Sequence, residues 1–240
     1  MSRAEFPIIS VNNLVKRFGL KTILRGLNFE VGKGEFVALL GPNGAGKTTF
    51  LRILASLSRP AAGRVKVAGF NLPSQAAAVR RQIGVVSHLP LLYGDLTAEE
   101  NLRFYARMYS IPNPDGRIKD VLKVVGLSAR RRDQVRTYSR GMQQRLAIGR
   151  AVLHDPEIML FDEPFTGLDQ DACAMLEDVL REVAARGRTV VMTSHDLSRA
   201  ADLASRFDVI SRGVIAASAQ RQDMGTNQML SFYRDAINAN

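Results

Sequence analysis

The sequence contains a single cysteine, Cys173, among its 240 residues, so no disulfide framework can form within the chain. Such sparse cysteine usage is typical of a reducing compartment, and we expect Cys173 to be a small buried hydrophobic residue. No apolar stretch approaches the roughly 20 residues that a membrane-spanning helix needs. The opening residues, MSRAEFPIIS, also lack the apolar core of a secretory signal. If the protein works at a membrane, we therefore expect another chain to span it.

Internal repeats, low-complexity segments, long heptad runs and CxxC pairs are also missing from the sequence. Their absence argues against coiled-coil or zinc-bearing insertions. Hydrophobic residues make up 46% of the chain and charged residues 23%, which is a globular composition with enough apolar side chains for a sizeable core. The net charge of +10, from 33 Lys and Arg against 23 Asp and Glu, suggests an anionic partner: a nucleotide, a nucleic acid or an acidic membrane surface.

Short apolar runs alternate with helical patterns along the chain. Runs bounded by turn residues and rich in β-branched side chains indicate buried strands. Strands that alternate with helices predict a parallel sheet with crossover connections. The strand candidates are FVALL (36–40), IGVVS (83–87), EIMLF (157–161), TVVMTS (189–194) and FDVIS (207–211).

The segment from about 89 to 155 differs from the rest, because it contains three helical patterns and no strong strand between them. We interpret it as a helical insert in an α/β core, with PNPDG (112–116) as a loop inside it. Near the C-terminus, residues 229–238 place four apolar side chains near one face of a predicted helix. This helix either docks on its own domain or binds a partner or a membrane surface. The four side chains are those of Met229, Leu230, Tyr233 and Ile237.

The stretch GPNGAGKTT (41–49) follows a predicted strand, opens a helix expected to run to about residue 57, and matches the phosphate-binding P-loop pattern. Its glycines let successive backbone N–H groups point at phosphate oxygens, and the helix adds the positive end of its dipole. Lys47 can supply a charge to the terminal phosphates, and Thr48 offers a hydroxyl to Mg²⁺. The predicted nucleotide-binding residues are Gly41, Pro42, Asn43, Gly44, Ala45, Gly46, Lys47, Thr48 and Thr49.

Two later strands end in polar residues. IMLFDEP (158–164) delivers Asp162, which can hold Mg²⁺ together with Thr48, and Glu163, which can orient or deprotonate a water for attack on a γ-phosphate. TVVMTSHD (189–196) delivers His195, which can hydrogen-bond that phosphate. A solvated acidic pair and a structural histidine are the alternatives. Because the carboxyl ends of parallel strands meet at the ligand crevice, we expect Glu163 and His195 to be catalytic residues.

These motifs resemble those of the ATP-binding subunits of ABC transporters, over about residues 8 to 218. The resemblance implies an α/β fold: a P-loop NTPase core, with a mixed, mainly parallel sheet and an N-terminal antiparallel β part, and a helical insert at about 89–155. It implies an ATP-binding domain at 1–218, a C-terminal tail at 219–240, and ATP and Mg²⁺ as cofactors. Phe18 matches the family's adenine-stacking aromatic residue, and Asp169 in GLD (167–169) is expected to face the other subunit.

The arginine-rich stretch YSRGMQQR (138–145) aligns with the family's signature loop, usually leucine-serine-glycine-glycine-glutamine. Only Ser139 and Gly141 match it, whereas Tyr138, Arg140 and Met142 differ. In the family this loop binds the γ-phosphate of ATP held by a second subunit in a head-to-tail dimer. We therefore expect the four residues 139–142 to act across a dimer, with Arg140 either adding a phosphate contact or pointing into solvent.

A second departure is His88, which stands where the family has its Q-loop glutamine. A neutral imidazole could hydrogen-bond a metal-bound water there and would make the linkage to the helical insert sensitive to pH. A histidine at this place, followed by LTAEENLRFYARMY (96–109), is similar to the ATP-binding subunits of heme exporters of bacterial cytochrome c maturation. The altered signature loop points the same way.

The resemblance implies an ATPase that energises a separate integral membrane transporter subunit. Its expected location is the cytoplasmic face of the bacterial inner membrane, as a peripheral protein paired with a second copy of itself or a homologous subunit. An exporter of another substrate, such as a lipid, drug or peptide, is the alternative. A nucleic-acid-associated ABC ATPase would suit the positive charge, but no coiled-coil or zinc insertion is present, so no nucleic acid is expected. Intact Glu163 and His195 disfavour a regulatory protein that binds ATP without hydrolysing it.

Overall fold

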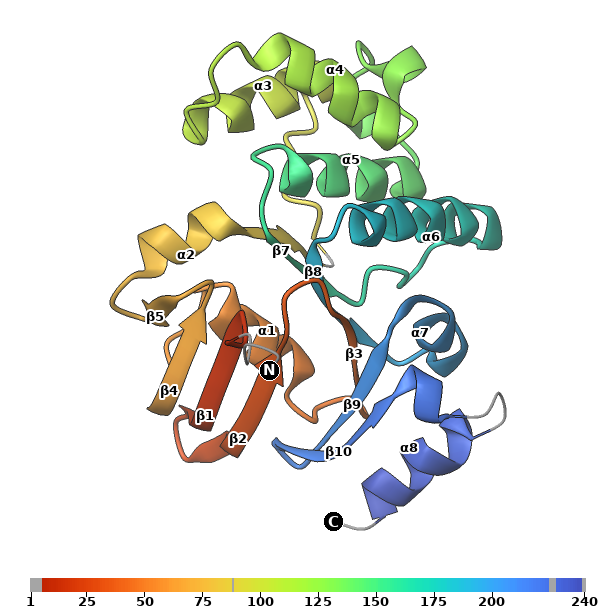
Figure 1. Cartoon of the computed structure of the whole chain (residues 1–240). Coiled ribbons are helices and arrows are strands. Elements are labelled where there is room, and N and C mark those ends of the chain that lie inside the picture. The colour runs from red at the N-terminus through yellow and green to blue at the C-terminus, as the bar shows by residue number, and fades with distance from the viewer. Residues whose placement is uncertain (1–5, 88, 225–227, 239–240) are drawn as a thin grey trace, which may run out of the picture.

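The computed structural model describes residues 6–87, 89–224 and 228–238, and it arranges them around a central six-stranded sheet (Figure 1). Five neighbouring strands of this sheet are parallel, and the edge strand β10 is antiparallel to β9. The predicted mixed, mainly parallel sheet is thus confirmed. Its order is β10 (Val214–Gln220), β9 (Arg206–Ser211), β3 (Phe36–Leu40), β8 (Thr189–Ser194), β7 (Ile158–Asp162) and β6 (Ile83–Val86).

A second, antiparallel sheet from the N-terminal part of the chain covers one face of the central sheet (Figure 1). Its order is β2 (Lys21–Val31), β1 (Ile9–Phe18), β4 (Ala62–Val67) and β5 (Phe70–Leu72). Strand β3 shows why the central sheet needs two covers, since all five of its side chains are buried. Alternate side chains of a strand point to opposite faces. Val37 and Leu39 therefore pack with the antiparallel sheet, and Ala38 and Leu40 pack with the helices on the other face.

Most helices pack on that other face, and three of them form the predicted insert. Helix α5 packs on β6 and connects α3 and α4 to the core, so the insert stands above the sheet in Figure 1. Thr97 starts α3 with a capping box, in which its hydroxyl and the Glu100 carboxylate each bond the other's backbone N–H. The helices are α1 (Lys47–Leu54), α2 (Ala76–Gln82), α3 (Ala98–Met108), α4 (Pro114–Val124), α5 (Arg140–Val152), α6 (Gln170–Ala185), α7 (Leu197–Leu203) and α8 (Met229–Asn238).

Several predicted boundaries need correction. The segment 112–116 is not wholly a loop, because α4 begins at Pro114. Proline suits the first helical position, where its fixed φ is helical and its missing N–H would have no partner, and Asp115 in the first turn favours the helix dipole. Helix α1 ends at Leu54 and not near residue 57. Residue 218, the proposed end of the first domain, lies inside β10, so we propose to move that end to Gln220.

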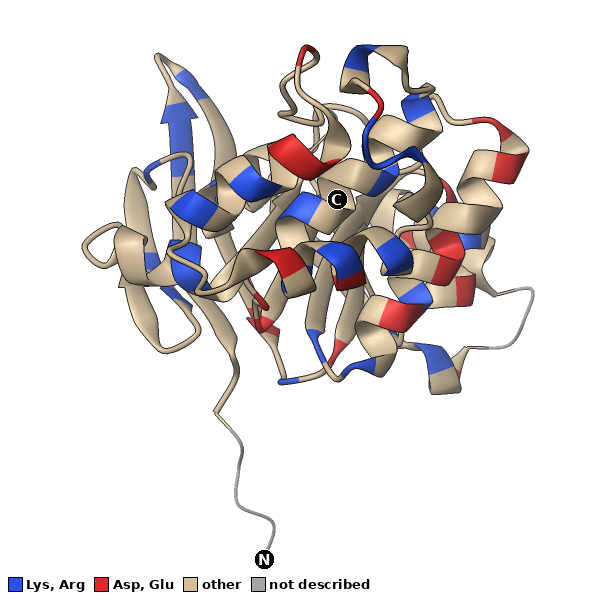
Figure 2. Cartoon of the chain, turned by 90° about the horizontal axis from the view of Figure 1, so that it is seen from above, with Lys and Arg blue, Asp and Glu red and all other residues tan. Residues whose placement is uncertain are grey.

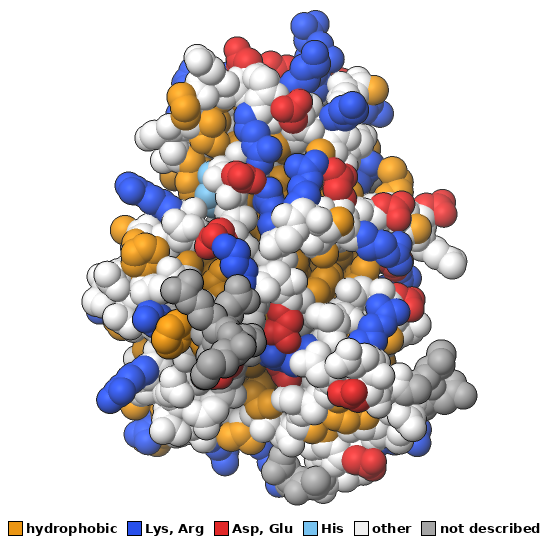
Figure 3. Space-filling view, in the orientation of Figure 1, with side chains coloured by type: hydrophobic (Ala, Val, Ile, Leu, Met, Phe, Trp, Pro, Cys, Tyr) orange, Lys and Arg blue, Asp and Glu red, His pale blue; other side chains and the backbone are white. Residues whose placement is uncertain are grey.

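On the face shown in Figure 3, the charged side chains are not gathered into one continuous stripe. Basic and acidic side chains are interspersed on the face shown in Figure 3. The strands of the antiparallel sheet differ, because they carry six basic residues and one acidic residue, Glu30 (Figure 2). Among the residues described here, no helix combines the length and apolar character that crossing a bilayer requires.

Candidate nucleotide-binding and hydrolysis site

Two glycines shape the loop between β3 and α1. A larger residue at either position would force neighbouring atoms to move. Gly41 has φ +150°, and a Cβ there would overlap the carbonyl oxygen of Ile210 on β9. Gly46 has φ +112°, and its Cβ would lie 2.8 Å from Leu24 Cδ2 on β2. Such φ values favour glycine. The loop is therefore held between the central sheet and the antiparallel sheet, at the carboxyl end of β3 where ligands bind in α/β folds.

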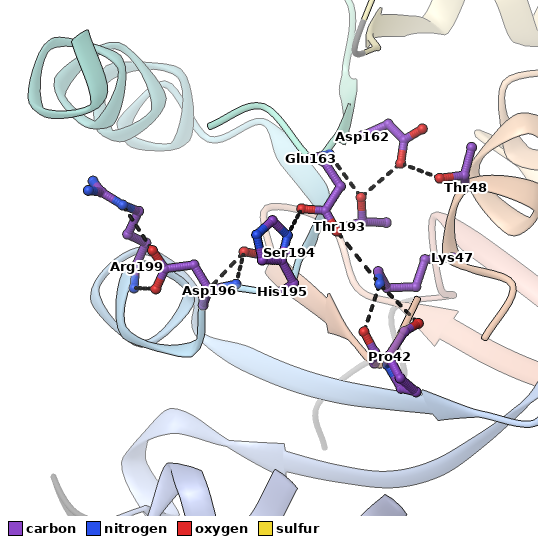
Figure 4. Close-up of polar contacts among 11 residues, drawn as sticks. Pro42, Lys47, Thr48, Asp162, Glu163, Thr193, Ser194, His195, Asp196 and Arg199 are labelled. Atoms are coloured by element: carbon purple, nitrogen blue, oxygen red, sulfur yellow. Dashed lines mark hydrogen bonds and ion pairs between the residues drawn. The ribbon is translucent and has the colours of Figure 1, made fainter. Parts of the chain in front are cut away.

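Lys47 is buried at the floor of this loop, with 6% of its surface exposed. Its ammonium donates hydrogen bonds to the carbonyl oxygens of Gly41 (2.7 Å) and Pro42 (3.4 Å). It also lies 3.6 Å from the Glu163 carboxylate (Figure 4). A buried cation needs such partners, because transfer of an isolated charge from water is costly. The loop thus wraps around a fixed positive charge.

Asp162 ends β7 and is fixed by two hydroxyl groups. Thr48 Oγ1 and Thr193 Oγ1 each donate to Asp162 Oδ1 at 2.9 Å, and the backbone N–H of Glu163 donates to Thr193 Oγ1 at 2.9 Å (Figure 4). Thr193 is the register partner of Asp162 on the neighbouring strand β8. Thr193 was not predicted from the sequence as a site residue. The Asp162 carboxylate and the Thr48 hydroxyl are hard oxygen donors, so this pair fits a Mg²⁺ ion.

Glu163 adopts a backbone conformation that most residues avoid, with φ +51°. Such positions cost on the order of 1–3 kcal/mol and cluster at functional sites. The conformation turns the side chain toward two groups at once. One carboxylate oxygen lies 3.6 Å from Lys47 Nζ, and the other lies 2.6 Å from His195 Nδ1 (Figure 4). A carboxylate that is 80% buried, beside a ring that is 63% exposed, is suited to hold a water and pass on its proton.

The turn that carries His195 is fixed on both sides. Before it, the backbone of Thr189–Ser194 is paired in β8. After it, the Asp196 side chain accepts a hydrogen bond from Arg199 N and caps α7, and it also pairs with the Arg199 guanidinium at 3.0 Å. His195 therefore approaches Glu163 from a rigid strand end.

These groups share one cavity of about 750 Å³. Most of the predicted P-loop residues line it, together with Asp162, Glu163 and His195. Five further residues also line it, and the sequence did not predict that they would lie at this cavity of their own chain. Those five come from four separate parts of the chain, because two of them lie on β2, so no single local sequence pattern connects them. They are Lys21, Ile23, Arg140, Thr166 and Tyr233.

Phe18, the predicted adenine-stacking residue, ends β1 and pairs in register with Lys21. Its ring is 56% exposed, and Lys16 Nζ lies 4.7 Å above its centroid. Lys21 lines the cavity, whereas Phe18 does not. The ring therefore stands at the rim, with a surface available to a base.

The signature stretch forms the start of α5. Ser139 is its N-cap, with Oγ accepting a hydrogen bond from Met142 N at 3.3 Å. Gly141 lies against α6, because a Cβ there would be 2.7 Å from Ala172 Cβ. Asp169 caps α6 by accepting from Ala172 N at 2.8 Å. The two helix N-termini are thus packed side by side.

Arg140 is an exposed residue whose side chain lies against the loop before α6. Its guanidinium lies over Gly167, where an added Cβ would be 2.5 Å from Arg140 Nη1, and its side chain lines the cavity described above. No hydrogen bond or ion pair joins Arg140 to another residue of the described chain. His88, the other departure from the family pattern, lies outside the described residues. Cys173 is buried, as predicted.

The sheet order, the P-loop and the carboxylates at the end of β7 define a P-loop NTPase. The sequence model of ABC transporters matches residues 24–166, and this chain belongs to the ABC transporter family as an ATP-binding subunit. It is therefore an ATPase of the kind coupled to transport.

The comparisons include relatives with named roles. The chain is similar to the linearmycin resistance ATP-binding protein LnrL of Bacillus subtilis (35% identity, covering 90% of this chain and 70% of LnrL). It is also similar to the Nod factor export ATP-binding protein I of Ralstonia nicotianae (36% identity, 93% and 70%).

Two solved structures share the fold. One is an ATP-binding subunit of an ABC transporter, with a TM-score of 0.82 and 29% identity over 97% of this chain and 96% of that one. The other is a dimeric ATP-binding cassette in a post-hydrolysis state, bound to ADP and Pi, with a TM-score of 0.80 and 28% identity over 89% and 98%.

Proposed function

We propose that this chain binds Mg-ATP in the cavity described above, hydrolyses it within a head-to-tail dimer, and thereby drives export through a separate membrane chain. The observation that carries the proposal is the convergence of Lys47, Asp162, Glu163 and His195 from three elements on one cavity. Phosphoryl transfer depends mainly on positioned charge, and this cavity places a cation, a metal-binding pair and a base within a few ångströms.

The proposed roles follow from those contacts. The loop 41–46 and the start of α1 hold the phosphates, with Lys47 at the terminal ones. Thr48 and Asp162 hold Mg²⁺, which neutralises phosphate charge when bound. Glu163 orients and deprotonates the attacking water, and His195 positions Glu163 and contacts the γ-phosphate. Phe18 and Lys21 receive the base at the rim.

The second half of the site is proposed to come from a partner subunit, either a second copy or a homologue. Ser139 is exposed at the N-terminus of α5 and does not line the cavity of its own chain. The proposed cross-dimer group is Ser139, Arg140, Gly141, Met142 and Asp169. A dimeric cassette of the same fold bound to ADP and Pi supports this arrangement.

Export is the direction that the relatives favour, since two of them are named for Nod factor export and linearmycin resistance. A location at the cytoplasmic face of the bacterial inner membrane, through an integral membrane partner, belongs to the same proposal.

Heme export is a second candidate, which rests on the sequence pattern around His88 and the altered signature loop. The genes beside this one discriminate between the two candidates. A membrane chain among cytochrome c assembly genes would favour heme, and its absence there would favour another exported substrate.

Glu163→Gln tests the proposal, because it keeps the shape of the side chain and removes the base. We expect ATP turnover to fall roughly 10²–10⁴-fold, while ATP binding persists and an ATP-dependent dimer accumulates. Phosphate release and light scattering after size exclusion measure the two effects. Glu157→Gln, on the surface beside Lys33, is the matched control and should retain full activity. Full turnover in Glu163→Gln would show that Glu163 is not the base.

A further inference from the structure

The C-terminal helix α8 brings a tyrosine into the nucleotide cavity. Helix α8 packs against α7, β9 and β10. Ala236 is buried, and Phe232, Tyr233 and Ile237 lie partly buried on the same apolar cluster. Tyr233 also lines the cavity that contains Lys47 and His195. The ring of this residue is therefore held by the core, while part of it reaches the cavity.

The hydroxyl of Tyr233 is unpaired within the described part of the chain. Neither a hydrogen bond nor an ion pair joins it to any residue that the structure describes. By contrast, the hydroxyl groups of Tyr105 and Tyr138 donate to the carbonyl oxygens of Leu91 and Arg130. Burial raises the pKa of the Tyr233 phenol, so the group remains a protonated donor at neutral pH. A phenol that is open to a cavity is suited to donate to an anionic oxygen.

Helix α8 and the hairpin expected to receive the base pack on different faces of the central sheet. Helix α8 belongs to the helical face of the central sheet, with Phe207 and Val209 of β9. The hairpin that carries Lys21 and Ile23 belongs to the antiparallel sheet on the opposite face (Figure 1). The base is expected at that hairpin. Tyr233 thus enters from the other side.

The neighbours of α8 lead to the same end of the cavity. Helix α7 follows His195 directly, and Ile210 at the end of β9 touches the backbone at Gly41. His195 and Gly41 belong to the part of the cavity proposed to hold the phosphates, and Gly213, just after β9, also touches Ile23 of the hairpin.

We propose that Tyr233 is a further nucleotide-binding residue, which donates a hydrogen bond to the terminal phosphate of ATP and so couples α8 to the presence of that phosphate. The proposal rests on the proposed function, because it needs a nucleoside triphosphate in this cavity. It also gives α8 a role beyond covering the sheet, since the helix would be held more tightly with ATP than with ADP.

Tyr233→Phe is the decisive variant, because it removes the hydroxyl and keeps the ring that packs on the core. We would measure the Kd of the full-length chain for AMP-PNP and for ADP, both with Mg²⁺, by calorimetry. A hydrogen bond to a charged group predicts that the Kd for AMP-PNP rises about tenfold, while the Kd for ADP changes by less than about twofold. Tyr93→Phe is the matched control, since Tyr93 is half exposed and lies outside the cavity.

A second readout separates binding from packing. Hydrogen exchange of α8 should slow more with AMP-PNP than with ADP in the wild type, and this difference should shrink in Tyr233→Phe. An unchanged AMP-PNP to ADP ratio in a variant that still binds both would overturn the inference and leave the proposed function intact. Equal weakening for both nucleotides would also overturn it, because the contact would not be to the terminal phosphate. Failure of the wild type to bind either nucleotide would instead overturn the proposed function.

Discussion

At His154 the local environment strongly shifts the ionisation of a side chain. Its ring stacks on Tyr109, with centroids 3.8 Å apart and planes 4° from parallel, and Nε2 lies 3.1 Å from the carbonyl oxygen of Ile83 on β6. Burial, followed by nearby arginines that include Arg150, lowers the pKa of His154 to about 4. The neutral ring donates from Nε2 to Ile83, and Nδ1 has no partner among the described residues.

This low pKa predicts that stability falls in mild acid. An unfolded chain protonates His154 near pH 6.5, whereas the folded chain does so only near pH 4. Below pH 6.5 the unfolded state therefore binds more protons, so the free energy of unfolding decreases as pH falls from about 6.5 to 4, by at most about 3 kcal/mol. Urea denaturation at several pH values measures this loss.

His154→Gln provides the matched comparison, because it removes the titrating ring. The part of the pH dependence that is due to His154 should disappear in this variant, although other groups will still titrate. Parallel stability curves for the two proteins between pH 4.5 and 7 would contradict the assignment.

At the scale of elements, the contact between α5 and α6 sets the position of the signature stretch. Gly141 near the start of α5 faces Ala172 near the start of α6, and Arg140 covers Gly167 in the loop before α6. Arg150, farther along α5, donates a 2.7 Å hydrogen bond to the carbonyl oxygen of Val85 on β6. A movement of α5 would therefore be transmitted both to the loop 166–169 and to the strand that leads toward residue 88.

Gly141→Ala tests this helix contact, because two effects of opposite sign compete. Replacing glycine by alanine within a helix usually stabilises it by about 1 kcal/mol. Here the new Cβ would lie 2.7 Å from Ala172 Cβ, and such overpacking costs about 1–3 kcal/mol. We expect a net loss of up to about 2 kcal/mol in the free energy of unfolding, measured by chemical denaturation.

Ala172→Gly restores the space and supplies the control. Alone it should destabilise by about 1 kcal/mol through helix propensity. Combined with Gly141→Ala, it should give a double variant whose loss in the free energy of unfolding is smaller than the sum of the two single losses. Additive effects would mean that the two helices do not meet at this contact in solution.

At the scale of the whole molecule, the proposed site needs two chains. Lys47→Ala damages the half of a site that holds phosphate, and Ser139→Arg places a bulky side chain in the half that the partner supplies. Each variant dimer carries two damaged sites. In a mixed dimer both lesions fall in one site, and the other site combines an intact Lys47 with an intact Ser139. We therefore expect mixing, or covalent linkage of the two variants, to restore ATP occlusion at one site.

Occlusion and turnover should be measured on the linked dimer, with a linked pair of Lys47→Ala chains as the control. If the linked dimer forms and occludes no ATP, Ser139 does not act across the interface. Its role would then be that of the N-cap seen here, worth about 1 kcal/mol to its own helix.

The sequence was sufficient for features that depend on neighbouring residues. The P-loop pattern predicted the turn at residues 41–46, because glycine alone tolerates its backbone and because the turn joins a strand to a helix. The strand at 36–40 was predicted with its observed limits, since a run buried on both faces is apolar throughout.

Only the tertiary structure decided which distant residues share the site. Thr193 meets Asp162 through the pairing of β8 with β7, and Tyr233 reaches the cavity through the packing of α8 on β9. The left-handed backbone of Glu163 likewise could not be read from an Asp-Glu pair, because its neighbours on β8 hold it there. Local patterns encode turns, caps and strands through short-range sterics and burial. The assembly of the site depends on strand order and side-chain packing, which join residues that are far apart in the chain.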